Sequence, residues 1–232
     1  MQHFSKNVAS DSFERQSFAR EETLEGLIAH PDRAIRADFD RSGIFVYQAF
    51  NSEIANYALE NGRFGRGFRT DRTTWVKPSF GWMLYRSNFA RNPNQERILR
   101  IKLNHEGFNE LLSAAVLTKY DSNVHGTKAG WDEISKRAKA RVQWDPERFI
   151  NKTKHPNQRA IQLGIGPLLI ERYNSEWIES IQDATHHAER ILTELKKGMK
   201  LTEIESPFVE MVFSPPKNVM RTLGMLLCSS TE

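Results

Sequence analysis

The sequence predicts an α+β fold in a single domain. Segments with the alternation or the β-branched content of strands lie between segments with the apolar spacing of helices. The spacing between these segments is irregular, which favours α+β over a regularly alternating doubly wound sheet. The chain has 232 residues, 39% of them hydrophobic, which is enough for one sizeable core.

The composition divides the chain into three expected parts. They are a polar, mobile N-terminal arm over residues 1–35, a main domain over 36–210 and a C-terminal tail over 211–232. Within the arm, residues 21–29 predict a short helix.

Charge and cysteine content exclude several classes of protein. Lys and Arg number 33 against 29 Asp and Glu, so the net charge of +4 tolerates an anionic partner without requiring one. The single cysteine, Cys228, excludes an intrachain disulfide framework. No apolar run approaches the length of a membrane span and the N-terminus does not resemble a secretory signal. We therefore expect a cytoplasmic protein with no membrane partner.

The first elements of the domain follow one another closely. Residues 43–50 are rich in β-branched and aromatic side chains and predict a strand. Asn51 offers an N-cap for a helix over residues 53–61, and Gly62 ends that helix. After a loop, residues 74–77 begin a second strand.

The middle of the chain alternates between the two element types. Residues 79–89 are apolar and of undecided type. Polar and apolar side chains alternate over 97–103, which predicts a half-buried strand, and residues 106–117 predict a helix. A polar loop is expected over 121–130, and a short strand over 141–144 that an Asp-Pro pair closes.

The last elements begin with a polar, basic loop over residues 151–157. A buried strand follows over 159–165, and two helices are expected over 168–183 and 184–197. Residues 220–227 form an apolar segment that suits a docked helix or a partner contact.

The segment from residue 63 to 86 carries the most unusual chemistry. Its arginines recur at every third position, at Arg63, Arg66, Arg69 and Arg72. That spacing fits no helical face, and the intervening glycines favour a loop. An aromatic run follows that includes Trp75, Lys77, Ser79, Trp82 and Arg86. Guanidinium groups bind phosphates and aromatic rings stack on bases, so the segment predicts a site for a phosphorylated, ring-containing ligand. The alternative is a solvated cationic loop beside a core strand.

Other chemistries have no sequence support. The seven histidines show no metal-ligand spacing, so we expect no metal. Neither Gly-rich phosphate-binding motif is present, nor the G-x-S-x-G motif of hydrolases.

Several motifs resemble the domain of unknown function 4291 family, a name that implies no settled activity. The resemblance is specific and covers about residues 35–195. It rests on residues 46–51, 71–80 with 82–87, 141–148 and 159–164.

The order of elements is more distantly similar to ADP-ribosyltransferase-type folds, especially the toxins that modify DNA. This resemblance implies a split mixed sheet with flanking helices. In such proteins a first strand holds the nicotinamide end of NAD, an aromatic-rich strand follows, and a later strand carries a glutamate. The corresponding segments here are 46–49, 74–80 and 159–162. Two departures stand out: Tyr47 and Gln48 replace the usual His or Arg, and Gln162 replaces the usual glutamate.

The resemblance implies NAD as a substrate and transfer of ADP-ribose to a nucleic acid or a small molecule. The implied catalytic residues are Tyr47, Lys77 and Gln162. The implied cofactor-binding residues are Gln48, Ala49, Arg63, Arg66, Arg69, Arg72, Trp75, Ser79, Trp82 and Arg86. Further candidates are Gln143, Asp145, Glu147, Arg148 and Arg159.

Structural roles remain open for many of these residues. Trp75 and Trp82 fit the core as well as a stacking site, and Gln162 fits a satisfied core amide. Gln143 and Arg148 fit a network that stabilises the turn at Asp145.

Cleavage of the nicotinamide–ribose bond develops positive charge on the ribose, which a carboxylate normally stabilises. Gln162 has no such charge, and its loss costs on the order of 3 kcal/mol in the transition state. Asp145 and Glu147 are the nearest acidic candidates by motif, with Asp71 behind them. Two other functions stay open: a nucleotide- or RNA-binding module without turnover, and an enzyme similar to the tRNA 2′-phosphotransferases.

Overall fold

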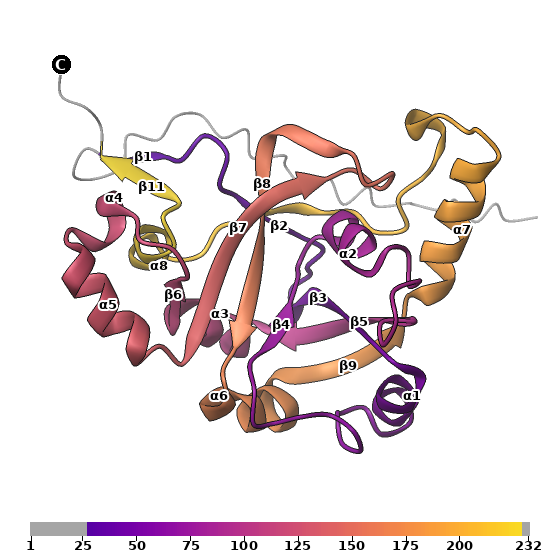
Figure 1. The fold of residues 1–232 in the computed structure, drawn as a ribbon, viewed down its shortest axis with the longest axis horizontal. Helices are drawn as coiled ribbons and strands as arrows, with labels where there is room; N and C mark the ends of the chain where they lie inside the picture. The colour runs from indigo at the N-terminus through magenta and orange to yellow at the C-terminus, as the bar shows by residue number, and fades with distance from the viewer. Residues whose placement is uncertain (1–26, 229–232) are drawn as a thin grey trace, which may run out of the picture.

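The computed structural model describes residues 27–228. Its centre is built from two sheets with helices around them (Figure 1). This mixture of strands and helices confirms the α+β expectation. The sequence predictions for residues 1–26 and 229–232 lie outside the described residues.

The first sheet has three antiparallel strands in the order β3-β5-β9. They are β3 (Gly43–Phe50), β5 (Arg97–Asn104) and β9 (Ile178–Asp183). The strands expected over 43–50 and 97–103 are confirmed.

The second sheet is mixed and has the order β4-β8-β7-β6. Its strands are β4 (Thr74–Val76), β8 (Lys154–Ile165), β7 (Ala140–Arg148) and β6 (Ala115–Leu117). Only the β6–β7 pair is parallel. The hairpin of β7 and β8 is longer than expected, because ladder pairing continues past Pro146 to Arg148 and Lys154. The loop expected over 151–157 is therefore wrong from residue 154 on, where β8 begins.

Two short strand pairs join the early and late parts of the described chain. The strands of each pair are antiparallel: β1 (Leu27–Ala29) with β11 (Leu226–Cys228), and β2 (Ile35–Ala37) with β10 (Met211–Phe213). Residues 27–29 form β1, so the helix expected over 21–29 is wrong for these residues. The rest of that expected helix lies outside the described residues. The division of the chain into arm, domain and tail stays a prediction.

The helices surround the sheets (Figure 1). They are α1 (Ser52–Asn61), α2 (Phe80–Ser87), α3 (His105–Ser113), α4 (Ser122–His125), α5 (Lys128–Lys136), α6 (Pro167–Arg172), α7 (Thr185–Lys196) and α8 (Lys217–Thr222), with a 3₁₀ turn over Leu201–Glu203.

Helix α1 shows how local sequence sets its ends. The Asn51 side chain accepts a hydrogen bond from the backbone N–H of Ile54 at 3.0 Å, which satisfies one of the unpaired N-terminal donors. Gly62 follows the last turn with a φ of 66°, a left-handed conformation that suits glycine. Both expected ends of this helix are confirmed.

Four expectations for the later elements are wrong or incomplete. The helix expected over 168–183 is only α6, followed by a π-helical turn over Tyr173–Trp177 and then by β9. The helix over 106–117 ends at Ser113, and β6 follows. The loop over 121–130 contains α4 and begins α5, because Asp121 and Thr127 act as N-caps. The segment over 220–227 divides between α8 and β11.

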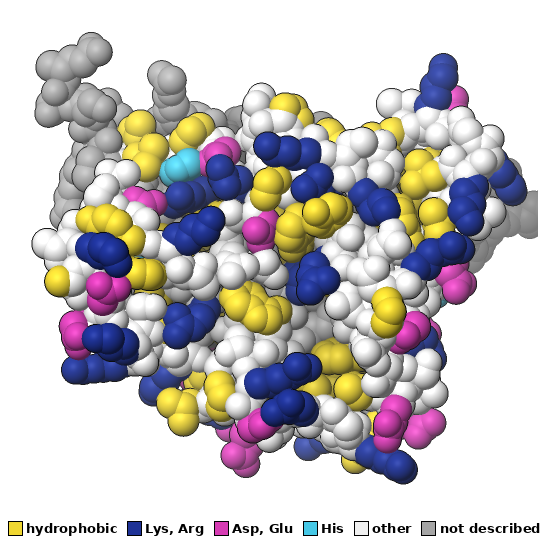
Figure 2. All heavy atoms as spheres, viewed as in Figure 1, with side chains coloured by type: hydrophobic (Ala, Val, Ile, Leu, Met, Phe, Trp, Pro, Cys, Tyr) yellow, Lys and Arg dark blue, Asp and Glu magenta, His cyan; other side chains and the backbone are white. Residues whose placement is uncertain are grey.

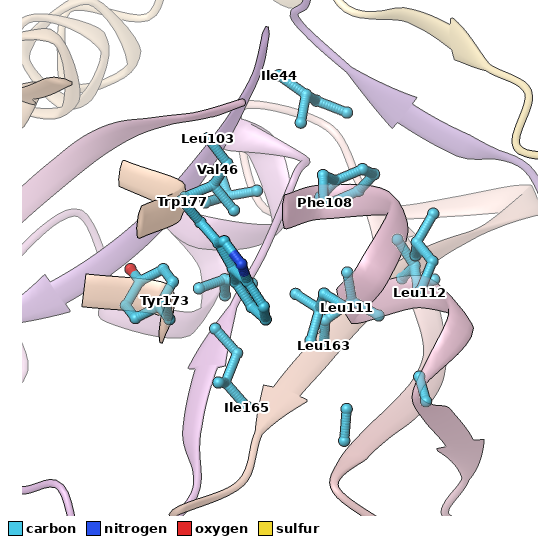
Figure 3. Packing of buried hydrophobic residues seen from close by; sticks show 14 of the residues in the cluster. Ile44, Val46, Leu103, Phe108, Leu111, Leu112, Leu163, Ile165, Tyr173 and Trp177 are labelled. Carbon is cyan, nitrogen blue, oxygen red and sulfur yellow. The ribbon is translucent and has the colours of Figure 1, made fainter. Parts of the chain in front are cut away.

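The main core lies between the two sheets. It combines apolar side chains of β3, β5 and β8 with those of α3 and the π-helical turn. Figure 3 shows the Trp177 ring between Tyr173 on one side and Leu111 and Leu163 on the other. Gly107 of α3 leaves room for this ring, because a Cβ there would lie 2.2 Å from Trp177 Cγ. The second sheet thus packs one face against this core, and polar side chains can lie on its other face.

A second core cluster covers the other side of the first sheet. Helices α2 and α7 supply most of it, through residues such as Phe80, Met83 and Ile191, and Tyr47 of β3 lies among them. The sequence left the type of residues 79–89 undecided. In the structure this segment contains α2, with Ser79 as its N-cap.

Candidate functional site

The outer face of the second sheet gathers several residues that the sequence singled out. Gln143 lies opposite Gln162 in the β7–β8 register. The β4–β8 register pairs Val76 with Leu163, which places Lys77 beside Gln162. We call Lys77, Gln143, Asp145 and Gln162 the polar face. It lies opposite the core because alternate residues of a strand point to opposite faces.

Gln162 is the centre of the polar face. Its Nε2 donates to Gln143 Oε1 at 2.8 Å and to Asp145 Oδ2 at 2.5 Å. The amide therefore fixes the side chains of β7 against β8. Asp145, one of the acidic candidates, is held directly beside Gln162.

Lys77 is the buried member of this group, with an exposed fraction of 6%. Its Nζ makes one long hydrogen bond, 3.4 Å to the backbone oxygen of Trp75. Burial, helped by the positive charge of Arg86 and opposed by the negative charge of Asp145, lowers the pKa of Lys77 to about 8. A lysine with this pKa is a positioned cation that can also release a proton near neutral pH.

Trp75 lies on the same side of the sheet, across Gly164. A Cβ at Gly164 would come within 3.1 Å of the Trp75 ring, so the glycine gives the indole its place over β8. Trp75 is partly exposed, so its ring is a candidate stacking surface next to the polar face.

Tyr47 and Gln48 are not brought to the polar face. Tyr47 is fully buried, and its hydroxyl has no hydrogen-bond partner among residues 27–228. The Gln48 amide donates to Thr74 Oγ1 at 2.7 Å and accepts from the Tyr173 hydroxyl at 2.7 Å. Ala49 packs against the second core cluster. These side chains therefore hold β3 to its neighbours, and burial prevents the ligand contacts that we expected of Tyr47 and Gln48.

The arginine loop connects α1 to β4 along the lower edge of the molecule in Figure 1. Two of its arginines are paired: Arg66 with Glu53 at 2.8 Å, and Arg69 with Asp71 at 2.6 Å. Arg63 and Arg72 are exposed and form no ion pair with any residue in 27–228.

Arg86, at the end of α2, is likewise exposed and has no ion pair within the described part of the chain. Figure 2 shows many Lys and Arg side chains over the face that carries β7 and β8, whereas most acidic groups lie toward its rim. This side of the protein is therefore suited to an anionic partner.

The remaining candidates from the sequence lie away from the polar face. Ser79 caps α2 by accepting from Trp82 N at 3.2 Å. The Trp82 ring is nearly buried and stacks on Tyr85 at 5.0 Å, and the Arg148 guanidinium lies 4.0 Å from the Tyr85 ring centre. Arg159 pairs with Asp32 at 3.0 Å. Their contacts are those of a packed framework at the far end of the β7–β8 hairpin.

Ser79, Glu147 and Arg148 also line a cleft of about 480 Å³, separate from the polar face. Two other lining residues, Arg36 and Glu210, were missed by the sequence analysis. Glu210 had one detectable signal: it is the single charged residue in the apolar run from Phe208 to Phe213. Arg36 had none, because its place depends on the pairing of β2 with β10.

Metal and membrane chemistry receive no support from the described residues. Within 27–228 no group of three His, Cys, Asp or Glu side chains is placed to hold a metal ion. No helix in that range is long and apolar enough to cross a membrane.

Comparison with known proteins identifies a family without giving an activity. No curated protein matches the chain. A family model matches residues 34–212, which include both sheets, the polar face and the cleft. The chain belongs to the family described as Domain of unknown function (DUF4291).

Proposed function

We propose that the protein binds NAD at the polar face and transfers ADP-ribose from it, with Asp145 in the role of the missing glutamate. The observation that carries this proposal is the 2.5 Å contact between Asp145 Oδ2 and Gln162 Nε2. Gln162 occupies the third motif position, and the carboxylate that the position lacks is supplied by the neighbouring strand.

The chemistry requires a negative charge beside the ribose. When the nicotinamide–ribose bond breaks, the ribose becomes oxocarbenium-like, and a fixed carboxylate stabilises that charge. Gln162 and Gln143 would orient Asp145 and hydrogen-bond the ribose hydroxyls. The Trp75 ring offers a stacking surface for the nicotinamide or the adenine, in place of the buried Tyr47 and Gln48.

The phosphates would be held by the cations around the face. Arg63, Arg72 and Arg86 are exposed and form no ion pair within 27–228, so binding a pyrophosphate breaks no existing pair. Lys77 adds a positive charge beneath the ligand. The acceptor of ADP-ribose is a nucleic acid or a small molecule in this proposal.

The strand arrangement also agrees with an ADP-ribosyltransferase-like split sheet. Strands β3 and β4 meet through Tyr47 and Lys77, whose backbones exchange hydrogen bonds of 2.7 and 3.1 Å. The two strands otherwise belong to different sheets. This divergence beside Lys77 supports the split sheet that the resemblance implies.

The test is incubation with NAD, with calorimetry for binding and mass analysis for released nicotinamide. Asp145→Asn keeps the shape of the side chain and removes its charge, so we expect nicotinamide release to fall about 100-fold with NAD affinity nearly unchanged. Asp132→Asn is the matched control, because Asp132 is an exposed carboxylate paired with Lys128 on α5. Gln162→Glu removes the amide that donates to Asp145 and sets a second carboxyl beside it, so turnover is expected to fall.

NAD binding without nicotinamide release in the wild type would contradict transfer and favour a second candidate. That candidate is a nucleotide- or RNA-binding module without turnover. The basic face in Figure 2 is the observation that favours it. Absence of NAD binding would contradict the nucleotide site at the polar face.

A further inference from the structure

The cleft behind α2 is a second site with its own chemistry. Its walls come from β2, the start of α2, the far end of the β7–β8 hairpin and the segment before β10. Gly81 brings α2 against β7, because a Cβ there would lie 2.2 Å from the backbone oxygen of Arg148. The volume of about 480 Å³ is typical of sites for small molecules.

Glu147 is a buried carboxylate of this cleft with one unsatisfied oxygen. Its exposed fraction is 6%. Oε1 accepts from Ser79 Oγ at 2.9 Å and from the backbone N–H of Arg148 at 2.8 Å. Oε2 is buried and has no partner among the described residues. A buried acceptor without a donor is costly, and a ligand that brings a donor would remove that cost.

Glu210 faces the same space from the segment before β10. Its Oε1 accepts from the backbone N–H of Phe80 at 2.6 Å, at the start of α2. Burial, together with the negative charges of Glu147 and Asp38, raises the pKa of Glu210 to about 8. The hydrogen bond from Phe80 and the charge of Arg36 oppose the rise. Near neutral pH this carboxyl is therefore mostly uncharged. Burial also raises the pKa of Glu147, against the hydrogen bonds from Arg148 and Ser79 and the charge of Arg36. The buried Oε2 of Glu147 is the acceptor left for a donor on the ligand.

Arg36 is the complementary group on β2. Burial raises the pKa of both Glu147 and Glu210, and the positive charge of Arg36 opposes the rise at each, so Arg36 lies near both. Even so, it forms no ion pair with either carboxyl or with any other residue in 27–228. An unpaired guanidinium and a half-paired carboxylate thus line one cleft without touching, which leaves room for a ligand between them.

Apolar side chains complete the lining. Phe149, Ile150, Leu201 and Phe208 contribute to the walls, together with His155, Gln158 and Arg148. The Arg148 guanidinium is engaged over the Tyr85 ring and His155 packs on Phe149, so neither is as open as Arg36. The described part of the cleft offers no metal cluster.

We propose that this cleft binds a small zwitterion of the α-amino acid type with an apolar side group. The ammonium group is received by Glu147, with Glu210 beside it. The carboxylate of the ligand pairs with Arg36, and the side group packs against Phe149 and Phe208. Each of the two charges that the cleft leaves unpaired then gains a partner. This site does not depend on NAD binding at the polar face.

The test compares three probes by calorimetry near neutral pH: L-phenylalanine, phenethylamine and 3-phenylpropanoate. They share the ring but carry both charges, only the ammonium, or only the carboxylate. We expect L-phenylalanine to bind with a Kd below about 1 mM and each single-charge probe at least about 10-fold more weakly. Thermal shifts of the wild-type protein with the same probes require no variant and should follow the same order.

Variants test which residue binds each charged group of the ligand. Glu147→Gln and Arg36→Met should each weaken L-phenylalanine binding about 10-fold or more. Glu133→Gln in α5 and Arg137→Met at its C-cap are matched controls, because both residues are exposed and pair with each other. Equal binding of L-phenylalanine and phenethylamine would overturn the zwitterion site, as would equal binding of 3-phenylpropanoate. Absence of binding by all three probes at about 10 mM would overturn it too.

Discussion

The polar face and the cleft hold ionisable groups of opposite charge away from water, with opposite consequences. Burial lowers the pKa of Lys77 to about 8 on the outer sheet face, and it raises the pKa of Glu210 to about 8 in the cleft. Lys77 has a carboxylate, Asp145, that partly compensates its charge. Glu210 has a second carboxyl, Glu147, that adds to its shift. The face therefore suits a bound anion, whereas the cleft suits a ligand that carries a cation.

The two groups also make opposite contributions to the pH dependence of stability. An acid with a raised folded pKa destabilises the fold progressively as pH rises from its unfolded pKa to its folded one. A base with a lowered folded pKa carries its full cost below that pKa and loses it as pH rises to its unfolded value. The contribution of Glu210 to stability therefore changes between about pH 4.5 and 8, and that of Lys77 between about pH 8 and 10.5.

The largest effect is expected for Glu210→Gln, which keeps an acceptor for Phe80 and removes the titration. At about pH 8.5 this variant should be more stable than the wild type by about 3 kcal/mol, because no buried carboxylate has to form. The gain should vanish by about pH 5. Urea unfolding across this range measures it, and a difference that stays constant with pH would contradict the buried titration.

A slightly smaller effect is expected for Lys77→Met, which fills the same space without a charge. At about pH 6 the variant should gain about 2 kcal/mol, since the wild type bears the full cost of burying an ammonium group. The gain should shrink as pH approaches about 10.5. The same unfolding series gives the comparison, and a gain that grows with pH would show that Lys77 is not buried as a cation.

Gly81→Ala tests whether the cleft and the polar face are independent sites, because it disturbs packing at the cleft only. The added Cβ would meet the backbone oxygen of Arg148, so α2 must shift away from β7 at a cost of about 1–2 kcal/mol. We expect the midpoint of thermal unfolding to fall and L-phenylalanine affinity to fall with it, while NAD affinity stays within about 3-fold. Equal loss of both affinities would show that the two regions are one site.

The smallest expected effect concerns the arginine loop. Arg72→Gln should lower the salt slope of binding to a single-stranded oligonucleotide by about one, because it removes one exposed cation. Arg69 is paired with Asp71, so Arg69→Gln should change the slope less. Slopes from fluorescence anisotropy at several salt concentrations make this comparison, and an unchanged slope for Arg72→Gln would exclude that side chain from the interface.

The sequence predicted those features of the fold that depend on residues close together in the chain. Asn51 and Gly62 set the ends of α1, and the strands over 43–50 and 97–103 follow from their own residues. The place of Gln143 opposite Gln162 depends on the pairing of β7 with β8. The helix prediction was wrong over 178–183 because Ile178 and Ile181 have the three-residue spacing of a helical face. Pairing with β5 turns them into a strand, and that partner is about 80 residues away. Arg36 and Glu210 meet only through the fold, so the cleft was not predictable.

The central claim is that the polar face, and not the cleft, holds the nucleotide. A crystal structure after soaking with NAD tests it most directly. We expect the nicotinamide ribose within hydrogen-bond reach of Asp145 and Gln162, with the pyrophosphate toward the loop that carries Arg63 and Arg72. A nucleotide bound between Glu147 and Arg36, or no nucleotide at a saturating NAD concentration, would contradict the account.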